Sequence, residues 1–175
     1  MNASPSPSGP DTAEHQIRIT ATADETGEAP GQTRVELLMA GHAVSRLYIV
    51  PFTIRIGDAT VRMDGIAGVG TDEEHRNRGY ARHILEAAVE HMRHGDAALT
   101  MLYGISDFYH RFGYTTAGPD HYIHLTHLER EPSLPPGWTV RPLQPGDLPS
   151  VQRLYDLNTR HAVGVAVRAP DSYIW

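Results

Sequence analysis

The chain has 175 residues, of which 40% are hydrophobic, and this length and composition are typical of a soluble globular domain with its own core. Acidic residues outnumber basic ones by 21 to 15, so the net charge of -6 argues against a nucleic-acid-binding surface and favours a cationic partner. The absence of cysteine excludes a disulfide framework, a thiol nucleophile and a thiolate metal site. No apolar run reaches the length of a membrane span and no signal peptide is evident, so we expect a cytoplasmic protein without a membrane partner.

The first third of the chain has the pattern of β-structure. Residues 1–14 are rich in Ser, Pro and Gly, which predicts a disordered tail. Alternating apolar and polar residues predict four strands, at residues 16–20, 35–39, 46–56 and 59–63. The pair Gly57-Asp58 predicts a hairpin turn, and Pro51 predicts an edge position or a bulge in its strand.

The stretch from residue 63 to residue 81 combines three patterns. Small, β-leaning residues at 63–71 are followed by an acidic loop at 72–74 and a basic turn that ends in Gly79. Apolar residues then recur at helical spacing, which predicts one buried helix face made of Ala81, Ile84, Leu85, Ala88, Val89 and Met92. Gly95 offers this helix a left-handed C-terminal stop. Because the first turn has no good capping side chain, its backbone N–H groups and the helix dipole favour a bound phosphate.

Two motifs resemble those of a known family. Residues 76–81 (Arg-Asn-Arg-Gly-Tyr-Ala) match the R/Q-x-x-G-x-G/A signature with which GNAT acetyltransferases hold the pyrophosphate of acetyl-CoA. A buried strand is predicted at 97–103, and residues 108–114 after it match the family pattern F/Y-Y-x-R-F/L-G-F/Y. The chain therefore resembles the GNAT family and, over residues 33–128, the N-terminal domain of Eis-like acetyltransferases. Taken alone, 76–81 also fits a tight strand-to-helix turn with solvated arginines.

The resemblance implies an α/β (α+β) GNAT fold, with a mixed, mostly antiparallel sheet that is splayed at the acetyl-CoA site. It implies that backbone groups of Val69 and Thr71 contact the pantetheine arm and that Tyr109 protonates the leaving CoA thiolate. It assigns the pyrophosphate to Arg76, Asn77, Arg78, Gly79, Tyr80 and Ala81. The alternatives to these ligand and catalytic roles are that Val69 and Thr71 belong to an ordinary strand and that Tyr109 only packs against its neighbours.

The implied function is direct transfer of an acetyl group from acetyl-CoA, as substrate, to an amine of a small molecule or protein. The alternative is a non-catalytic domain that binds acyl-CoA or packs against a partner. GNAT domains normally open with a strand and two helices, but the polar stretch between residues 20 and 33 has no amphipathic helix. The acceptor site and the general base are therefore not assigned.

The domain organisation is expected to have two parts. Residues 15–128 form the GNAT domain, and residues 129–137 form a proline-rich linker. Residues 138–175 resemble the start of a second GNAT domain, with a strand at 138–143 and a helix that begins at 145–147. We expect residues 138–161 to dock on the domain of residues 33–128, in their own or a neighbouring chain, which in the second case makes a homo-oligomer.

Histidine spacing does not predict a metal site. His121, His124 and His127 recur every three residues, but the strand predicted at residues 121–126 places His124 on the opposite face from the other two. His91 and His94 share a helix face without a third ligand. The chain also lacks the G-x-S-x-G elbow of serine hydrolases.

Overall fold

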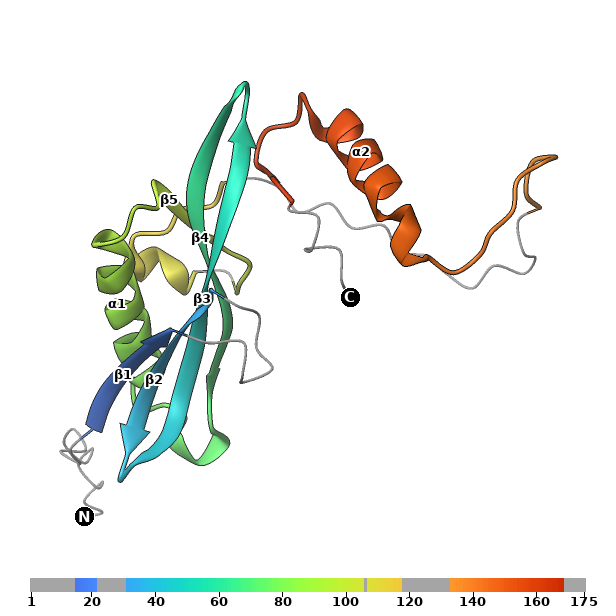
Figure 1. The fold of residues 1–175 in the computed structure, drawn as a ribbon. Coiled ribbons are helices and arrows are strands. Elements are labelled where there is room, and N and C mark those ends of the chain that lie inside the picture. The colour runs from blue at the N-terminus through green and yellow to red at the C-terminus, as the bar shows by residue number, and fades with distance from the viewer. Residues whose placement is uncertain (1–14, 22–30, 106, 118–132, 169–175) are drawn as a thin grey trace, which may run out of the picture. The chain divides into compact units, whose positions relative to one another are not determined.

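A computed structural model describes residues 15–21, 31–105, 107–117 and 133–168 (Figure 1). The chain forms two compact units. The first comprises residues 1–114 together with 162–167, and the second comprises residues 115–161 and 168–175. The predicted tail at 1–14, the predicted strand at 121–126 and residues 129–132 of the predicted linker lie outside the described residues.

The first unit is built on a six-stranded sheet. Its strands are β1 (His15–Ala21), β2 (Thr33–Met39), β3 (His42–Ile56), β4 (Ala59–Thr71), β5 (Leu99–Leu102) and β6 (Val165–Ala166). They run in the order β1-β2-β3-β4-β5, and β6 pairs with β3. All pairs are antiparallel except β4 with β5, which are parallel because helix α1 (Tyr80–Arg93) connects them. This mixed, mostly antiparallel sheet confirms the predicted fold class.

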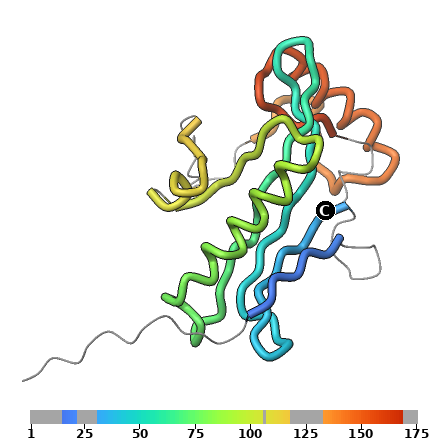
Figure 2. Tube along the Cα trace, turned by 90° about the vertical axis from the view of Figure 1, so that its left-hand side faces the viewer, coloured from blue at the N-terminus to red at the C-terminus, as the bar shows by residue number. Residues whose placement is uncertain are grey.

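Helix α1 lies along one face of the sheet and closes the main core (Figures 1 and 2). The apolar stripe predicted for the helix is confirmed at Ile84, Leu85 and Ala88, which are completely buried. They face side chains of β2 and β3 that are equally buried: Val35, Leu37 and Leu47. Each such aliphatic side chain contributes about 1.5–3 kcal/mol through burial, so the helix is firmly attached to the sheet.

Three local predictions need correction. Gly95 is not left-handed; instead the N–H groups of His94 and Gly95 donate to the carbonyls of His91 and Met92, at 3.2 and 3.0 Å. Strand β5 is shorter than the predicted 97–103, and its residues alternate between half-buried and exposed. It pairs with β4 alone among the described strands, so it is an edge strand, and the prediction of a buried strand was wrong.

The presence of Pro51 within β3 is explained by the strands that pair with β3. Pairing with β2 ends at Ile49, and pairing with β6 begins at Ile54. Pro51 lies between these points, where no described strand adjoins β3 on that side, so its missing N–H breaks no ladder there. The predicted edge position of Pro51 is confirmed. The predicted turn at Gly57-Asp58 joins β3 to β4.

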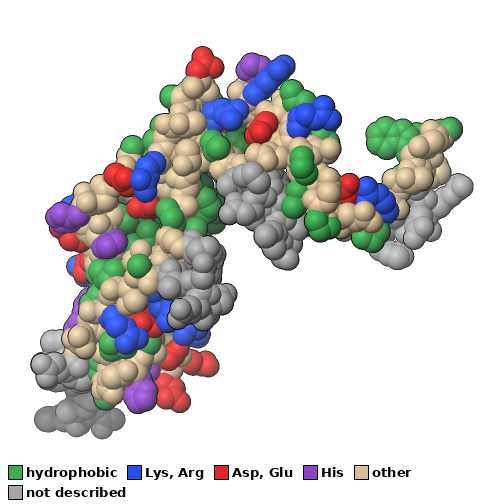
Figure 3. Space-filling view, in the orientation of Figure 1, with side chains coloured by type: hydrophobic (Ala, Val, Ile, Leu, Met, Phe, Trp, Pro, Cys, Tyr) green, Lys and Arg blue, Asp and Glu red, His purple; other side chains and the backbone are tan. Residues whose placement is uncertain are grey.

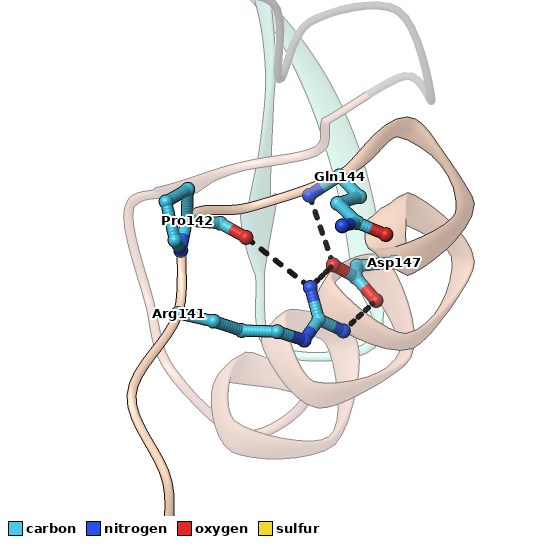
Figure 4. A network of polar contacts seen from close by, with 4 residues as sticks. All are labelled: Arg141, Pro142, Gln144 and Asp147. Carbon is cyan, nitrogen blue, oxygen red and sulfur yellow. Dashed lines mark hydrogen bonds and ion pairs between the residues drawn. The ribbon is translucent and has the colours of Figure 1, made fainter.

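The second unit contains the 3-10 turn η4 (Pro145–Asp147) and helix α2 (Leu148–Thr159). The Asp147 carboxylate accepts two hydrogen bonds from Arg141, at 2.7 and 2.8 Å, and one from the Gln144 N–H, at 2.9 Å (Figure 4). The hydrogen bonds from Arg141 are the main reason why the pKa of Asp147 is lowered to about 2. The predicted helix is therefore confirmed, with its beginning fixed by this network.

The predicted strand at 138–143 is not formed, because these residues pair with no strand in the described part of the chain. No residue of α2 is buried, and Leu154 and Leu157 are 54% and 50% exposed. Figure 3 shows hydrophobic side chains on the surface of this unit. Within the described residues, no helix of either unit is long and apolar enough to cross a membrane.

Candidate active site

The turn before α1 presents backbone N–H groups at a helix end. Gly79 is the N-cap residue of α1 and has a left-handed conformation, with φ of 81°, and Asn77 has φ of 62°. The N–H groups of Arg82 and His83 both donate to the Gly79 carbonyl, at 3.0 and 3.2 Å. The N–H groups of residues 80 and 81 precede these first intrahelical donors, so they point out of the helix end. With the helix dipole, they favour an anion.

Gly79 is required by its backbone conformation and not by crowding. A Cβ atom at this position would meet no protein atom within 4 Å. The positive φ, however, strains any residue with a side chain. The open space beside Gly79 leaves the backbone accessible to a ligand.

The side chains of the predicted pyrophosphate residues differ in accessibility. Tyr80 is 5% exposed, and its ring lies in the core, 6.2 Å from the ring of His15, so only its backbone faces outward. Arg76 and Arg78 are exposed, and the Arg76 Nε donates to the Thr71 carbonyl at 3.3 Å. The acidic residues at 72–74 are exposed too, as predicted for a solvated loop.

The sheet opens where β5 leaves β4. Their pairing runs from Met63 with Leu99 to Ile66 with Leu102, whereas β4 continues to Thr71. Beyond Ile66, no described strand pairs with β4 on the β5 side. This part of β4 therefore has an open backbone edge.

Thr71 directs its backbone toward that open edge. The Asp72 N–H donates to the Val44 carbonyl at 2.9 Å, which makes Ser45 and Thr71 a non-hydrogen-bonded pair of the antiparallel ladder. The N–H and carbonyl groups of Thr71 consequently point away from β3. The bond from Arg76 to the Thr71 carbonyl fits this orientation.

A β-bulge lies in the same part of β4. The register changes from Arg46 opposite Gly70 to Tyr48 opposite Ala67, so Gly68 and Val69 together face one residue of β3. Gly68 has φ of 60°, and a Cβ there would lie 3.0 Å from Cδ2 of Tyr48. The side chain of Val69 packs against the main core. The bulge thus changes the direction of the β4 backbone just beyond its last pair with β5.

Tyrosine side chains gather after β5. Tyr109 begins the 3-10 helix η3 (Tyr109–Phe112), and its ring makes T-shaped contacts with Phe108 and Tyr114, at centroid distances of 5.0 and 6.2 Å. The Tyr114 hydroxyl is 3.0 Å from Thr100 Oγ1. The Tyr109 hydroxyl has no hydrogen-bond partner among the described residues. Burial raises the pKa of Tyr109, so its hydroxyl stays protonated at neutral pH.

Two residues beside these tyrosines, Thr100 and Asp64, were not predicted as part of the site. Thr100 pairs with Asp64 across β5 and β4, and burial raises the pKa of this aspartate. The charges of Asp64 and Tyr109 both influence the pKa of Tyr114, which burial raises most strongly. Only the register between the two strands reveals this group, because its members are far apart in the sequence. No cluster of three metal-ligating side chains occurs within the described residues.

The family assignment follows from a direct match. The family model described as the acetyltransferase (GNAT) domain matches residues 22–117, which is more than half of the chain. The chain therefore belongs to the GNAT acetyltransferase family, whose members are N-acetyltransferases that use acetyl-CoA. The matched range includes α1, the turn before it and the tyrosines after β5. Comparison with curated proteins gives no match.

Similar solved structures include members of the same class. A conserved Enterococcus faecalis protein of unknown function is 24% identical with a TM-score of 0.45, and the alignment covers 47% of this chain and 21% of that one. A GCN5-related N-acetyltransferase from Kribbella flavida is 25% identical with a TM-score of 0.42, covering 45% and 21%. Eis1 from Mycobacterium abscessus is 13% identical with a TM-score of 0.49, covering 58% and 31%. The chain thus spans about a fifth of the length of the first two proteins.

Proposed function

We propose that this protein transfers an acetyl group from acetyl-CoA to an amine of a small molecule or protein. The observation that carries the proposal is the order of three consecutive elements. The open edge of β4 is followed by the turn at 76–81, and this turn leads into α1. Strand β4, helix α1 and Tyr109 pack on the same buried cluster. The proposed sites for the phosphate group, the pantetheine arm and the proton donor therefore all lie in the first compact unit.

Each part of the proposed site has a separate task. Backbone N–H groups at 77–81 hold the pyrophosphate, and the exposed side chains of Arg76 and Arg78 add positive charge. The backbone groups of Val69 and Thr71 bind the pantetheine arm. Because Thr71 directs its N–H and carbonyl away from β3, it offers a donor to an extended ligand, and its carbonyl has a second lone pair beside the one that accepts from Arg76.

The proposed reaction is direct transfer without a covalent enzyme intermediate. The amine nitrogen attacks the thioester carbonyl carbon, the carbon–sulfur bond breaks, and the sulfur takes the hydroxyl proton of Tyr109. The nitrogen loses its surplus proton to water, and water restores the proton of Tyr109. A general acid of this kind typically contributes about 10²- to 10⁴-fold to the rate.

The test maps the ligand onto the backbone by amide NMR. Adenosine 3′-phosphate 5′-diphosphate, the fragment of CoA that carries the pyrophosphate, should shift the resonances of residues 77–81, whereas pantetheine should shift those of Val69 and Thr71. Whole CoA should shift both sets and leave residues of α2 unchanged. Shifts confined to α2, or no saturable shifts, would contradict the proposal. Binding without any thiol release from acetyl-CoA and an amine favours the alternative of a non-catalytic acyl-CoA-binding domain.

We also propose that residues 15–128 are the catalytic domain and that residues 138–175 begin a second GNAT-like domain. The proposal is supported by Leu154 and Leu157, whose exposed side chains form an uncovered apolar face on α2. Such a face gains free energy when it is covered, by about 25 cal/mol per Å². The double change Leu154→Glu with Leu157→Glu should therefore prevent self-association in analytical ultracentrifugation. Gln152→Glu is the matched control on the same helix, and a monomer in all three proteins would contradict docking between chains.

A further inference from the structure

Gly104, just after β5, lies unusually close to the ring of Tyr109. A Cβ atom at position 104 would overlap Cε2 of Tyr109 and would lie 2.8 Å from Cδ2 of the same ring. It would also lie 3.0 Å from Cδ1 of Leu102. Real Cβ atoms do not approach ring carbons this closely, so the ring occupies space that only glycine leaves free.

The backbone conformation does not explain this glycine. Gly104 lacks the positive φ that requires glycine at Gly79 and Gly113, with φ of 81° and 89°. At those two positions, conversely, a Cβ would meet nothing within 4 Å. The requirement for glycine at 104 therefore comes from the contact with the Tyr109 ring.

Other contacts hold the ring from further directions. Phe108 meets it edge-on, with an interplanar angle of 88°, and Tyr114 meets it at 75°. Tyr114 is itself tied to β5 through its hydrogen bond with Thr100. Gly104, Phe108 and Tyr114 thus surround the Tyr109 ring at the end of β5. We call this ring position the seat of Tyr109, and Gly104 forms one side of it.

We propose that Gly104 is a positioning residue, which lets the Tyr109 ring seat against the end of β5 and so fixes the place of its hydroxyl. The inference rests on the proposed role of Tyr109 as general acid. A methyl group at 104 displaces the ring, because the ring is the far end of a side chain that can rotate. The hydroxyl moves with the ring, while the turn at 76–81 and the open edge of β4 keep their structure.

The kinetic test is a double-mutant cycle of Gly104→Ala and Tyr109→Phe. Gly104→Ala should lower kcat by at least about tenfold, a share of the 10²- to 10⁴-fold expected for a general acid, with KM for acetyl-CoA unchanged. Phenylalanine keeps the ring and the overlap but has no hydroxyl, so Gly104→Ala should have no further effect on kcat in that background. Equal losses in both backgrounds, or no loss in either, would overturn the proposal. Gly146→Ala, where a Cβ meets nothing within 4 Å, is the control.

A second readout is independent of activity and of the role of Tyr109 in catalysis. Burial raises the pKa of Tyr109. If Gly104→Ala moves the ring toward water, the pKa of Tyr109 falls toward 10, as measured by phenol absorbance relative to Tyr109→Phe. An unchanged pKa would contradict the seat even if kcat fell. If Tyr109→Phe leaves kcat unchanged but this pKa shifts, the general-acid role fails and the seat stands.

Thermal unfolding covers the case in which Gly104→Ala destabilises the fold. The change Tyr109→Ala removes the ring and makes room for a methyl group at 104. The double variant with Gly104→Ala should then have a Tm no lower than that of Tyr109→Ala alone, because the remaining close contact is with the end of the Leu102 side chain, which can rotate away. A further drop in Tm would show that the methyl group disturbs something other than the ring.

Discussion

The candidate site has two halves: the turn at 76–81, which is built from backbone groups, and the tyrosines after β5, which contribute side chains. The turn at 76–81 uses backbone groups: Gly79 is fixed by a φ of 81°, and the ring of Tyr80 is buried away from the ligand side. The tyrosine half uses side chains, with the Tyr114 hydroxyl tied to Thr100 and the Tyr109 hydroxyl uncommitted among the described residues. A backbone site depends on conformation, whereas a side-chain site depends on a single functional group. The two halves should therefore respond differently to substitution.

The largest expected effect is on the side-chain half. Tyr109→Phe should lower kcat by about 10²- to 10⁴-fold and leave KM for acetyl-CoA nearly unchanged, because only a proton transfer in the transition state is lost. Tyr103→Phe is the matched control, since Tyr103 is 79% exposed and loses the same hydroxyl. A loss below roughly threefold would assign Tyr109 to packing alone.

On the backbone half, Gly79→Val should raise the Kd for CoA by about tenfold or more. A β-branched residue at positive φ costs about 1–3 kcal/mol, and relief of that strain rearranges the turn. Calorimetry measures the affinity, and circular dichroism checks the fold. Gly57→Val is the matched control, because Gly57 has φ of 60° and equally open surroundings in the turn at the opposite end of β3 and β4. Unchanged affinity in a folded Gly79→Val protein would remove the pyrophosphate assignment.

Removal of a side chain from the turn should weaken CoA binding less than a change in the backbone conformation of the turn. Arg76→Ala should raise the Kd for CoA by only about two- to fivefold, because exposed charges contribute about 0.2–1 kcal/mol. Arg93→Ala removes the same charge from the other end of α1 and should leave the Kd unchanged. If Arg76→Ala weakens binding more than Gly79→Val does, the turn is a side-chain site and the comparison between the halves is wrong.

The smallest effect on activity is expected from loss of the hydrogen bond between Thr100 and Tyr114, which supports the tyrosine half of the site. The hydrogen bond between the hydroxyls of Thr100 and Tyr114 lowers the pKa of Tyr114, so Thr100→Val should raise that pKa further above 10. The loss of the bond should cost about 0.5–1.5 kcal/mol in the free energy of unfolding. Activity should remain within about twofold of the original protein, since the support carries no transferred proton. A loss of kcat as large as that of Tyr109→Phe would identify Tyr114 as the acid.

The raised pKa of Tyr109 also sets a pH dependence. Its folded pKa lies above its unfolded value near 10, so this group's contribution to stability is complete below pH 10 and is lost as pH rises through the folded pKa. The hydroxyl is protonated over the same range. The rate should therefore show no loss of the acid between pH 7 and about 9. A basic limb in that range that disappears in Tyr109→Phe would contradict the raised pKa.

Sequence patterns predicted the parts of this site that depend on local structure. Helix α1 follows from its apolar stripe, since Ile84, Leu85 and Ala88 recur at helical spacing, and the turn follows from Gly79. The bulge at Gly68 and the seat at Gly104 were not predicted as such. Both depend on a residue that is distant in the sequence or on the packing of a ring, which no local pattern records. The strand expected at 138–143 failed for a related reason, because a strand needs a partner.

Acetyl transfer by the full chain tests the central claim most directly. Acetyl-CoA is incubated with a panel of polyamines, aminoglycosides and lysine-containing peptides, and free CoA thiol and acetylated amine are both measured by mass spectrometry. The account predicts that thiol and acetylated amine appear in equal amounts with at least one acceptor, and that Tyr109→Phe abolishes most of this product. Tight binding of CoA without thiol release across the whole panel would contradict the account and identify a non-catalytic acyl-CoA-binding domain.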